Sequence, residues 1–259
     1  MKRPALLLSV LCGGALLGLS APWLSGLAHA AGADEEAPAP ALHPRYLDLR
    51  AAPRIAGDAA AGKEKSQVCS ACHGEDGGGT APPFPNIGGQ RADFFYWQLV
   101  ELKRGRHPSP MTPLVATLDD QDMRDLAAYY ASLPLHPATA GVSDDAAGTV
   151  DAALLERGRG LYLHGDPAKG IPPCQGCHGA DARGMPGADV ADRSGRTPYA
   201  AFPVLRGQQA AYLQAKLGEY RAGDLHDSTG DFIMAGVGRR LDEDSIQAVS
   251  AWLSSLRED

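Results

Sequence analysis

The chain has 259 residues, of which 44% are hydrophobic and only 6% aromatic, and its formal net charge at pH 7 is −7. A protein this acidic is a poor partner for nucleic acid, because binding to phosphates is driven by basic side chains. The length allows two domains of ordinary size.

The first 30 residues are typical of a secretory signal peptide. Lys2 and Arg3 precede an apolar run, and Ala28-His29-Ala30 forms a small-x-small cleavage site. Glycines and a proline interrupt the apolar run, which disfavours the alternative of a retained membrane anchor. We therefore expect export to the periplasm with cleavage near Ala30/Ala31. Loss of Lys2 and Arg3 takes the formal charge to −9.

The pattern Cys-x-x-Cys-His occurs twice and is the attachment signature of c-type haem. Two thioethers would form at Cys69 and Cys72 and two at Cys174 and Cys177, and the following histidines, His73 and His178, would ligate iron. A thioredoxin-like pair would be expected beside a βαβ pattern, and a zinc ribbon would leave both histidines without a role. Once Cys12 leaves with the signal segment, the motifs use every cysteine, so we expect no disulfides. The sequence predicts two covalently bound haem c groups.

An internal duplication follows an N-terminal extension, residues 31–56, that is rich in alanine, proline and charge and is expected to be flexible or loosely packed. The two copies align at offsets that grow along the chain, from 105 (73 with 178) through 118 (84–90 with 202–208) to 123 (118–120 with 241–243). Such a repeat predicts two homologous domains. We place them at 57–137 and 153–259, with a linker at 138–152.

Each copy reads as helices joined by glycine- and proline-rich connections, with no strand pattern, so we predict an all-α fold. One helix leads into the cysteine pair. Others are predicted at 92–104 and 210–222, each stopped by a glycine, and at 120–132 and 243–256. Asp119 and Asp242 are the expected N-caps of the last pair. An apolar stripe at i, i+3, i+4 and i+7 runs along residues Met123, Leu126, Ala127 and Tyr130.

The second axial ligand of each iron is predicted to be a methionine, Met111 in the first copy and Met234 in the second. Both stand seven residues before the leucine that precedes the Asp N-cap. Prolines around Met111 favour an extended loop across the far face of the haem. The other methionines fit less well, since Met123 lies on the apolar stripe and Met185 is too close to His178. Histidines 107, 136, 164 and 226 have no counterparts in the repeat and are expected in surface or linker positions.

Two lesser features also repeat. The stretches 84–90 and 202–208 place Phe-Pro before Gly-Gln, which either lets backbone approach the porphyrin or marks a loop. Basic residues on the repeated elements are candidates for pairing with haem propionates: Arg91, Lys103, Arg206 and Arg221.

The paired motifs, the Phe-Pro-x-x-x-Gly-Gln stretch and the Met-Thr-Pro loop before Leu-Asp-Asp-Gln-Asp-Met resemble the dihaem cytochrome c4 family from about Gly57 to Leu256. The resemblance implies two class I cytochrome c domains in tandem, related by pseudo-twofold symmetry, each haem ligated by His and Met. It also implies a periplasmic carrier between the quinol-oxidising part of a respiratory chain and a terminal oxidase. A charged insertion at residues 184–198 departs from the pattern and leaves the partner surface near the second haem open.

We therefore expect an electron-transfer protein without a small-molecule substrate, whose partners are redox proteins and which has no nucleic-acid partner. Peripheral association with a membrane is left open. One alternative is an electron-accepting cytochrome subunit of a periplasmic dehydrogenase complex, which has the same site chemistry and differs only in its surface. Another is a dihaem peroxidase or sulfur-compound oxidoreductase, which would need an open iron site.

Overall fold

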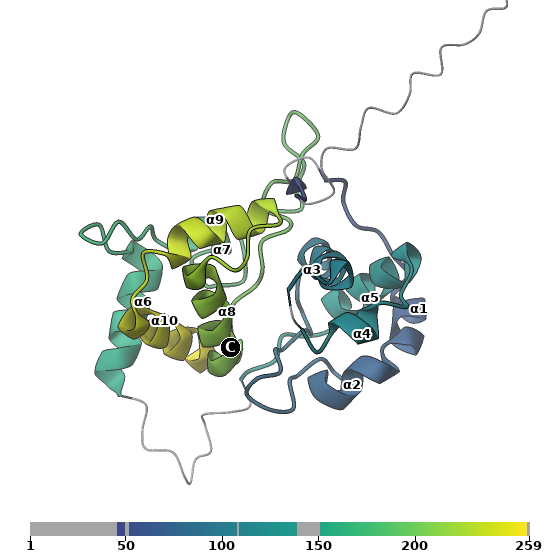
Figure 1. Cartoon of the computed structure of the whole chain (residues 1–259), viewed down its shortest axis with the longest axis horizontal. Coiled ribbons are helices and arrows are strands. Elements are labelled where there is room, and N and C mark those ends of the chain that lie inside the picture. Colours follow the sequence, from purple (N-terminus) through teal and green to yellow (C-terminus); the bar gives the residue numbers. More distant parts are fainter. Residues whose placement is uncertain (1–45, 50–51, 108, 139–150, 258–259) are drawn as a thin grey trace, which may run out of the picture. The chain divides into compact units, whose positions relative to one another are not determined.

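Ten helices make up the regular structure of residues 46–49, 52–107, 109–138 and 151–257, which are the residues that the computed structural model describes. Within these ranges there are two isolated β-bridges and no strand, so the all-α prediction is confirmed. Figure 1 shows the helices in chain order. In the first half they are α1 (Ala59–Lys65), α2 (Gln67–His73), α3 (Ala92–Arg104), α4 (Thr112–Val115) and α5 (Asp120–Ser132). In the second half they are α6 (Ala152–His164), α7 (Gln175–His178), α8 (Ala210–Ala222), α9 (Thr229–Gly238) and α10 (Glu243–Ser255).

The repeated helices begin and end at the predicted signals. Glycines 105 and 223 follow α3 and α8 in the left-handed conformation, with φ of 63° and 83°, which a side chain would strain. The carboxylate of Asp119 accepts a hydrogen bond from Asp122 N at α5, and that of Asp242 accepts one from Ser245 N at α10. These caps satisfy free N–H groups of the first helical turn.

The terminal helices of each half cross at a glycine. A Cβ atom on Gly62 of α1 would lie 2.5 Å from Asp125 C and 2.8 Å from Tyr129 Cβ on α5. A Cβ atom on Gly158 of α6 would lie 2.7 Å from Ala248 C and 2.8 Å from Trp252 Cβ on α10. Only glycine therefore lets the two helices of each pair approach this closely.

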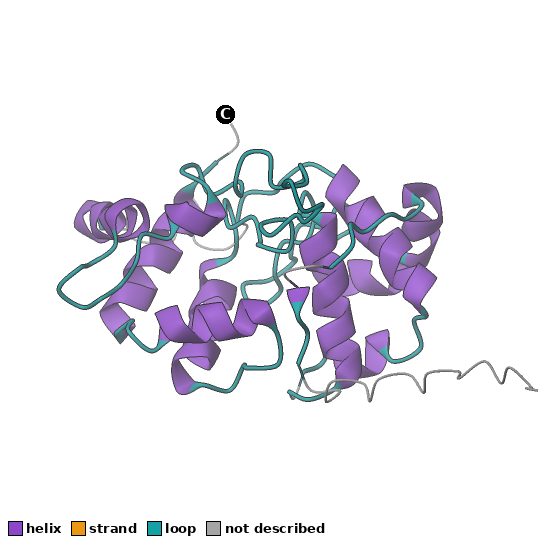
Figure 2. Cartoon of the chain, turned by 90° about the horizontal axis from the view of Figure 1, so that it is seen from above, coloured by secondary structure: helices purple, strands orange, loops and turns teal. Residues whose placement is uncertain are grey.

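Each half has its own apolar core. In the first half α3 and α5 pack through Phe95, Leu99, Leu126 and Tyr130, and in the second α6 and α10 pack through Tyr162, Ile246, Val249 and Leu253. Met123 is 5% exposed, as its place on the apolar stripe predicts. The more extensive helix-to-helix contacts run within each half. Hydrogen bonds from loop residues also join the two halves. Figure 2 shows the helices and loops from above.

Two helices were not anticipated. Met111 is the N-cap of α4 with φ −76° and ψ −26°, so the extended loop predicted around it is wrong. A proline in the first turn of α4 suits a helix start, where its missing N–H is not needed. Met234 lies within α9, which begins with Ser228 as N-cap accepting from Asp231 N.

The described end of the N-terminal extension is held by hydrogen bonds. Leu47 N donates to Asp227 O over 2.7 Å, and Thr229 N donates to Leu47 O over 2.9 Å, at the start of α9. Ile55, which we assigned to the extension, is buried in the core of the first half. The predicted signal segment and most of the predicted linker lie outside the described residues. No helix within the described ranges has the length and hydrophobicity needed to cross a membrane.

Candidate haem sites

The first site is built on α2, which carries Cys69, Cys72 and His73. A spacing of three places the two sulfur atoms on the same helix face, where one planar group can be bonded to both. His73 is 6% exposed, and its Nδ1 atom lies 2.9 Å from Pro85 O. That contact fixes the plane of the ring and leaves Nε2 available to a metal. Gly74 follows with φ 71°, which turns the chain away from the site.

The second site repeats this arrangement on a shorter helix. Cys174 is the N-cap of α7, and Cys177 and His178 lie in the helix. His178 is 7% exposed, with Nδ1 3.0 Å from Pro203 O. The prolines are equivalent in the repeat, so the Phe-Pro stretch provides a backbone acceptor for the histidine of the motif in both halves. The sequence left open whether the Phe-Pro stretch approaches the porphyrin or only marks a loop. The structure gives it the role of orienting the histidine.

Burial sets the protonation states of both sites. It lowers the pKa of His73 and His178, which favours the neutral imidazole with a free lone pair. Burial raises the pKa of Cys69 and Cys177, and raises that of Cys174 to about 11. Neutral thiols and neutral imidazoles suit buried positions, because neither carries an unpaired charge.

The donor set fits haem c and not a metal ion held by the cysteines themselves. The four described cysteines form no disulfide, so each sulfur is available for a thioether. Among the described residues no group of three or more His, Cys, Asp or Glu side chains is placed to hold a metal ion, which removes the basis for a zinc ribbon. Arg91 Nε and Thr112 Oγ1 are buried without a hydrogen-bond partner. Buried polar atoms without a partner fit a cofactor that brings anionic groups of its own.

The four basic candidates for propionate pairing divide into two kinds. Three are engaged elsewhere, since Lys103 donates to Leu118 O, Arg206 donates to Arg257 O, and Arg221 pairs with Glu243 at 3.1 Å. Arg91 donates through Nη2 to Met185 O over 3.0 Å and keeps its buried Nε without a partner. Arg91 is therefore the candidate that the structure favours.

The predicted methionine ligands lie on the two unanticipated helices. Met111 is half-buried and packs against the apolar core of the first half, as Cys69 does. Met234 is also half-buried, and its helix α9 packs on α8. Phe232 and Ile233 beside it are 69% and 37% exposed.

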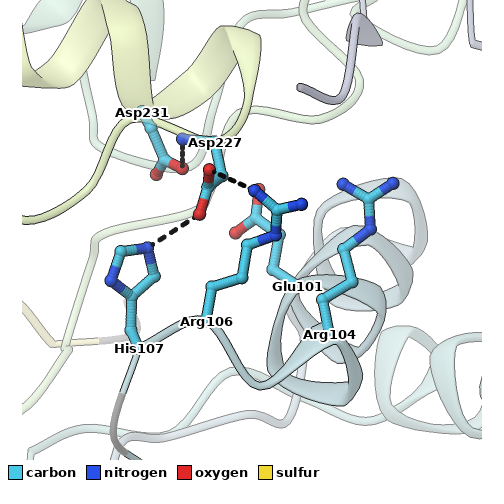
Figure 3. A pocket seen from close by; sticks show the side chains of 6 residues that line it. All are labelled: Glu101, Arg104, Arg106, His107, Asp227 and Asp231. Atoms are coloured by element: carbon cyan, nitrogen blue, oxygen red, sulfur yellow. Dashed lines mark hydrogen bonds and ion pairs between the residues drawn. The ribbon is translucent and has the colours of Figure 1, made fainter. Parts of the chain in front are cut away.

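Sequence reasoning missed a cluster of charged side chains that precedes both methionines (Figure 3). Asp227 accepts from Arg106 Nη1 over 2.9 Å, and its second carboxylate oxygen lies 3.1 Å from His107 Nε2. Burial, together with the Asp231 carboxylate, raises the pKa of the neighbouring Glu101 to about 7. These residues come from segments more than a hundred positions apart and are not repeated, so no local pattern indicated their pairing.

Comparison with known proteins identifies the family. The Cytochrome c family model matches residues 59–134 and 155–257. Cytochrome c4 of Azotobacter vinelandii is 34% identical over 220 residues, covering 81% of this chain and 94% of that protein. The thiosulfate dehydrogenase electron acceptor of Stutzerimonas stutzeri is 31% identical over 193 residues, covering 74% and 80%. The crystal structure of reduced recombinant cytochrome c4 from Pseudomonas stutzeri has a TM-score of 0.64 and 35% identity, covering 78% of this chain and 100% of that one.

Cytochrome c4 proteins transfer electrons and are not enzymes, so the peroxidase and oxidoreductase alternatives are not carried further. The two buried Cys-x-x-Cys-His sites, their repeated proline acceptors and these similarities lead to one assignment. The chain belongs to the dihaem cytochrome c4 family, as an electron-transfer protein with two class I cytochrome c domains in tandem, each with a covalently bound haem c.

Proposed function

We propose that the protein is an exported periplasmic carrier that takes single electrons from a quinol-oxidising complex and passes them to a terminal oxidase. His73 and Met111 ligate one iron, and His178 and Met234 ligate the other. The observation that supports this most directly is the symmetric pair of buried histidines, each oriented by a proline carbonyl. The haem supplies the one-electron chemistry, and the chain supplies its ligands and surroundings.

The residues around each site keep the reorganisation on electron transfer small. A histidine fixed by a backbone carbonyl and a methionine on a packed helix would both hold the iron, so no ligand would have to enter or leave. We propose the domains at residues 57–137 and 153–259, with the signal peptide removed near Ala30/Ala31.

A second candidate function is that of an electron-accepting partner in a periplasmic dehydrogenase complex. The similarity to a thiosulfate dehydrogenase electron acceptor favours it. The charged insertion 184–198 is a candidate docking segment. One part of it is hydrogen-bonded to the rest of the chain, and another part is exposed to solvent. Arg54 Nη1 donates to Asp189 O over 2.6 Å, whereas Val190 is 71% exposed.

Methionine ligation is tested by Met111→His and Met234→His. The oxidised wild type should show the weak near-infrared sulfur-to-iron band at an intensity for two sites. Each variant should halve the band and lower the potential of its own haem, because imidazole donates more strongly than a thioether. Met123→Leu is the matched control, a volume-conserving change of a core methionine that should leave the band intact. An unchanged band in Met111→His would assign the first iron to another ligand.

The partner is tested with membrane fractions and with a purified dehydrogenase. A respiratory shuttle should be reduced rapidly by a quinol-oxidising fraction and reoxidised by an oxidase-containing one, and both rates should fall with salt. A dehydrogenase subunit should instead co-purify with its enzyme and lose this association when residues 189–196 are replaced by a short glycine-serine segment. Slow reaction with both membrane fractions would end the respiratory proposal.

A further inference from the structure

Two equivalent glutamines form hydrogen bonds between the halves of the protein. Gln208 Oε1 accepts from Asn86 N over 2.8 Å, and Gln208 Nε2 donates to Asn86 O over 2.8 Å. In the reciprocal pair, Gln90 Oε1 accepts from Val204 N over 2.8 Å, and Gln90 Nε2 donates to Val204 O over 3.1 Å. Both the glutamines and the residues that they bind are related by the same repeat offset of 118. All four residues are at least nine-tenths buried.

Each glutamine binds the peptide group that orients the histidine of the opposite half. The C=O of Pro85 and the N–H of Asn86 belong to one peptide unit. Its oxygen accepts from His73 Nδ1, and its N–H donates to Gln208. Likewise, the peptide unit between Pro203 and Val204 joins His178 Nδ1 to Gln90. Two buried hydrogen-bond chains therefore run from a histidine in one half to a glutamine in the other.

Hydrogen bonds in such a chain strengthen one another. A peptide N–H that donates to a good acceptor shifts electron density onto its own carbonyl oxygen, which then accepts more strongly. A stronger acceptor at Nδ1 makes the imidazole a better electron donor at Nε2. A better donor favours ferric iron and so lowers the reduction potential. Burial keeps water from replacing the glutamine in this role.

We propose that Gln90 and Gln208 are positioning residues that act in trans, with Gln208 tuning the iron site of His73 and Gln90 tuning that of His178. This inference rests on the proposed ligation by the two histidines. It gives the duplicated chain a property that neither domain has alone, since the potential of each haem depends on a side chain of its neighbour.

The two ends of the interface are not equally supported. Asn86 Nδ2 donates to Gly207 O over 2.9 Å, and Gly79 N donates to Asn86 Oδ1 over 2.8 Å. Val204 stands at the equivalent place and has no polar side chain. The loop that orients His73 is therefore held by more than Gln208, whereas the loop that orients His178 depends more heavily on Gln90. We expect loss of Gln90 to have the larger effect.

The test replaces each glutamine by methionine, which has a similar shape and makes no comparable hydrogen bond. The potentials of the two haems are measured separately in the holoprotein by optical titration with NMR assignment of each haem. Gln208→Met should raise the potential of the His73 haem more than that of the His178 haem, and Gln90→Met should do the reverse. Shifts confined to the variant's own half, equal shifts at both haems, or none would overturn the proposal.

A second readout follows the histidines themselves. In Gln208→Met the Nδ1–H signal of His73 should move and exchange faster with water, whereas that of His178 should stay unchanged. Gln209→Met is the control, because Gln209 is fully buried at the same interface and bonds Gly79 O and the Asn86 side chain, outside the chain to His73. Its loss should lower stability and leave both potentials in place. If it moves the His73 haem as far as Gln208→Met does, general loosening explains both and the proposal fails.

Two further measurements distinguish a failure of the glutamine proposal from a misfolded variant and from a failure of the proposed iron ligation. If Gln208→Met does not fold, Gln208→Glu keeps an acceptor for Asn86 N–H and should lower the potential of the His73 haem more than that of the other. An upward or equal shift would count against the chain. The wild type also tests the underlying ligation, because a spectrum without histidine ligation would refute the proposed iron sites themselves. Normal wild-type spectra with absent trans shifts would refute the glutamine role alone.

Discussion

The crossing of α6 and α10 allows a prediction whose magnitude follows from the structure. In Gly158→Ala the new Cβ would lie 2.7 Å from Ala248 C and 2.8 Å from Trp252 Cβ, and closer still to Ala248 O. Carbon atoms pack at about 3.5–4.0 Å, so the helices have to separate by about 1 Å. Overpacking of this kind costs about 1–3 kcal/mol or more. The better helix propensity of alanine offsets about 1 kcal/mol. Because both close contacts involve backbone or Cβ atoms, we expect the cost near its upper end and a net loss of about 2 kcal/mol.

Gly160→Ala on the same helix is the matched control, because a Cβ atom on Gly160 would meet nothing within 4 Å. It should stabilise the second domain by about 0.5–1 kcal/mol, since only propensity changes. Urea denaturation followed by circular dichroism at 222 nm should therefore separate the two variants by about 3 kcal/mol. Tyr162 of α6 also donates to Gly179 O, next to His178, so the spectrum of the second haem should respond in Gly158→Ala alone. Equal midpoints for the two alanine variants would refute the reasoning.

Two predictions concern the charged cluster of Figure 3. Folded Glu101 titrates near pH 7 and its unfolded form near 4.5, so the folded state binds the extra proton between these values and stability should fall as pH rises from about 4.5 to 7. The fall in stability is up to about 3 kcal/mol. It should disappear in Glu101→Gln, which denaturation midpoints at pH 5 and pH 8 would reveal. If the stability of that variant depends on pH as strongly as that of the wild type, the assignment to Glu101 is wrong. Asp227→Asn should lower stability by about 1–2 kcal/mol by weakening the pairs with Arg106 and His107. Asp224→Asn removes the same charge at an exposed position and should be neutral, so equal losses in both would show a net-charge effect.

The sequence was informative where local chemistry determines the structure. The starts of α5 and α10 were predicted correctly because an aspartate N-cap satisfies N–H groups of its own first turn. The ends of α3 and α8 were predicted because glycine alone adopts the left-handed conformation without strain. The haem motifs could be recognised in the same way, since the attachment signature lies within five adjacent residues.

Prediction failed where the reason for a structure lies elsewhere in the chain. Helix α9 contains Gly230, Gly236 and Gly238, which lower its intrinsic helix propensity. Gly238 is explained by packing, because a Cβ there would lie 2.8 Å from Tyr220 Cβ on α8. One local signal was available, since Ser228 followed three residues later by Asp231 is a helix start. The glycines at the two helix crossings gave no such signal, because their partners lie far away in sequence.

The Phe-Pro-x-x-x-Gly-Gln stretch shows why duplication matters for this fold. Each copy contains a proline carbonyl that orients its own histidine and, five residues later, a glutamine that binds the equivalent peptide in the other copy. In a single domain the glutamine and the peptide N–H would both lack this partner. Two copies related by a pseudo-twofold axis satisfy both groups at once. In such an arrangement the glutamine of the first copy binds the peptide of the second, and the glutamine of the second binds the peptide of the first. Repetition of the stretch was visible in the sequence, but its reciprocal pairing requires a contact across 114 and 122 residues that only the folded chain provides.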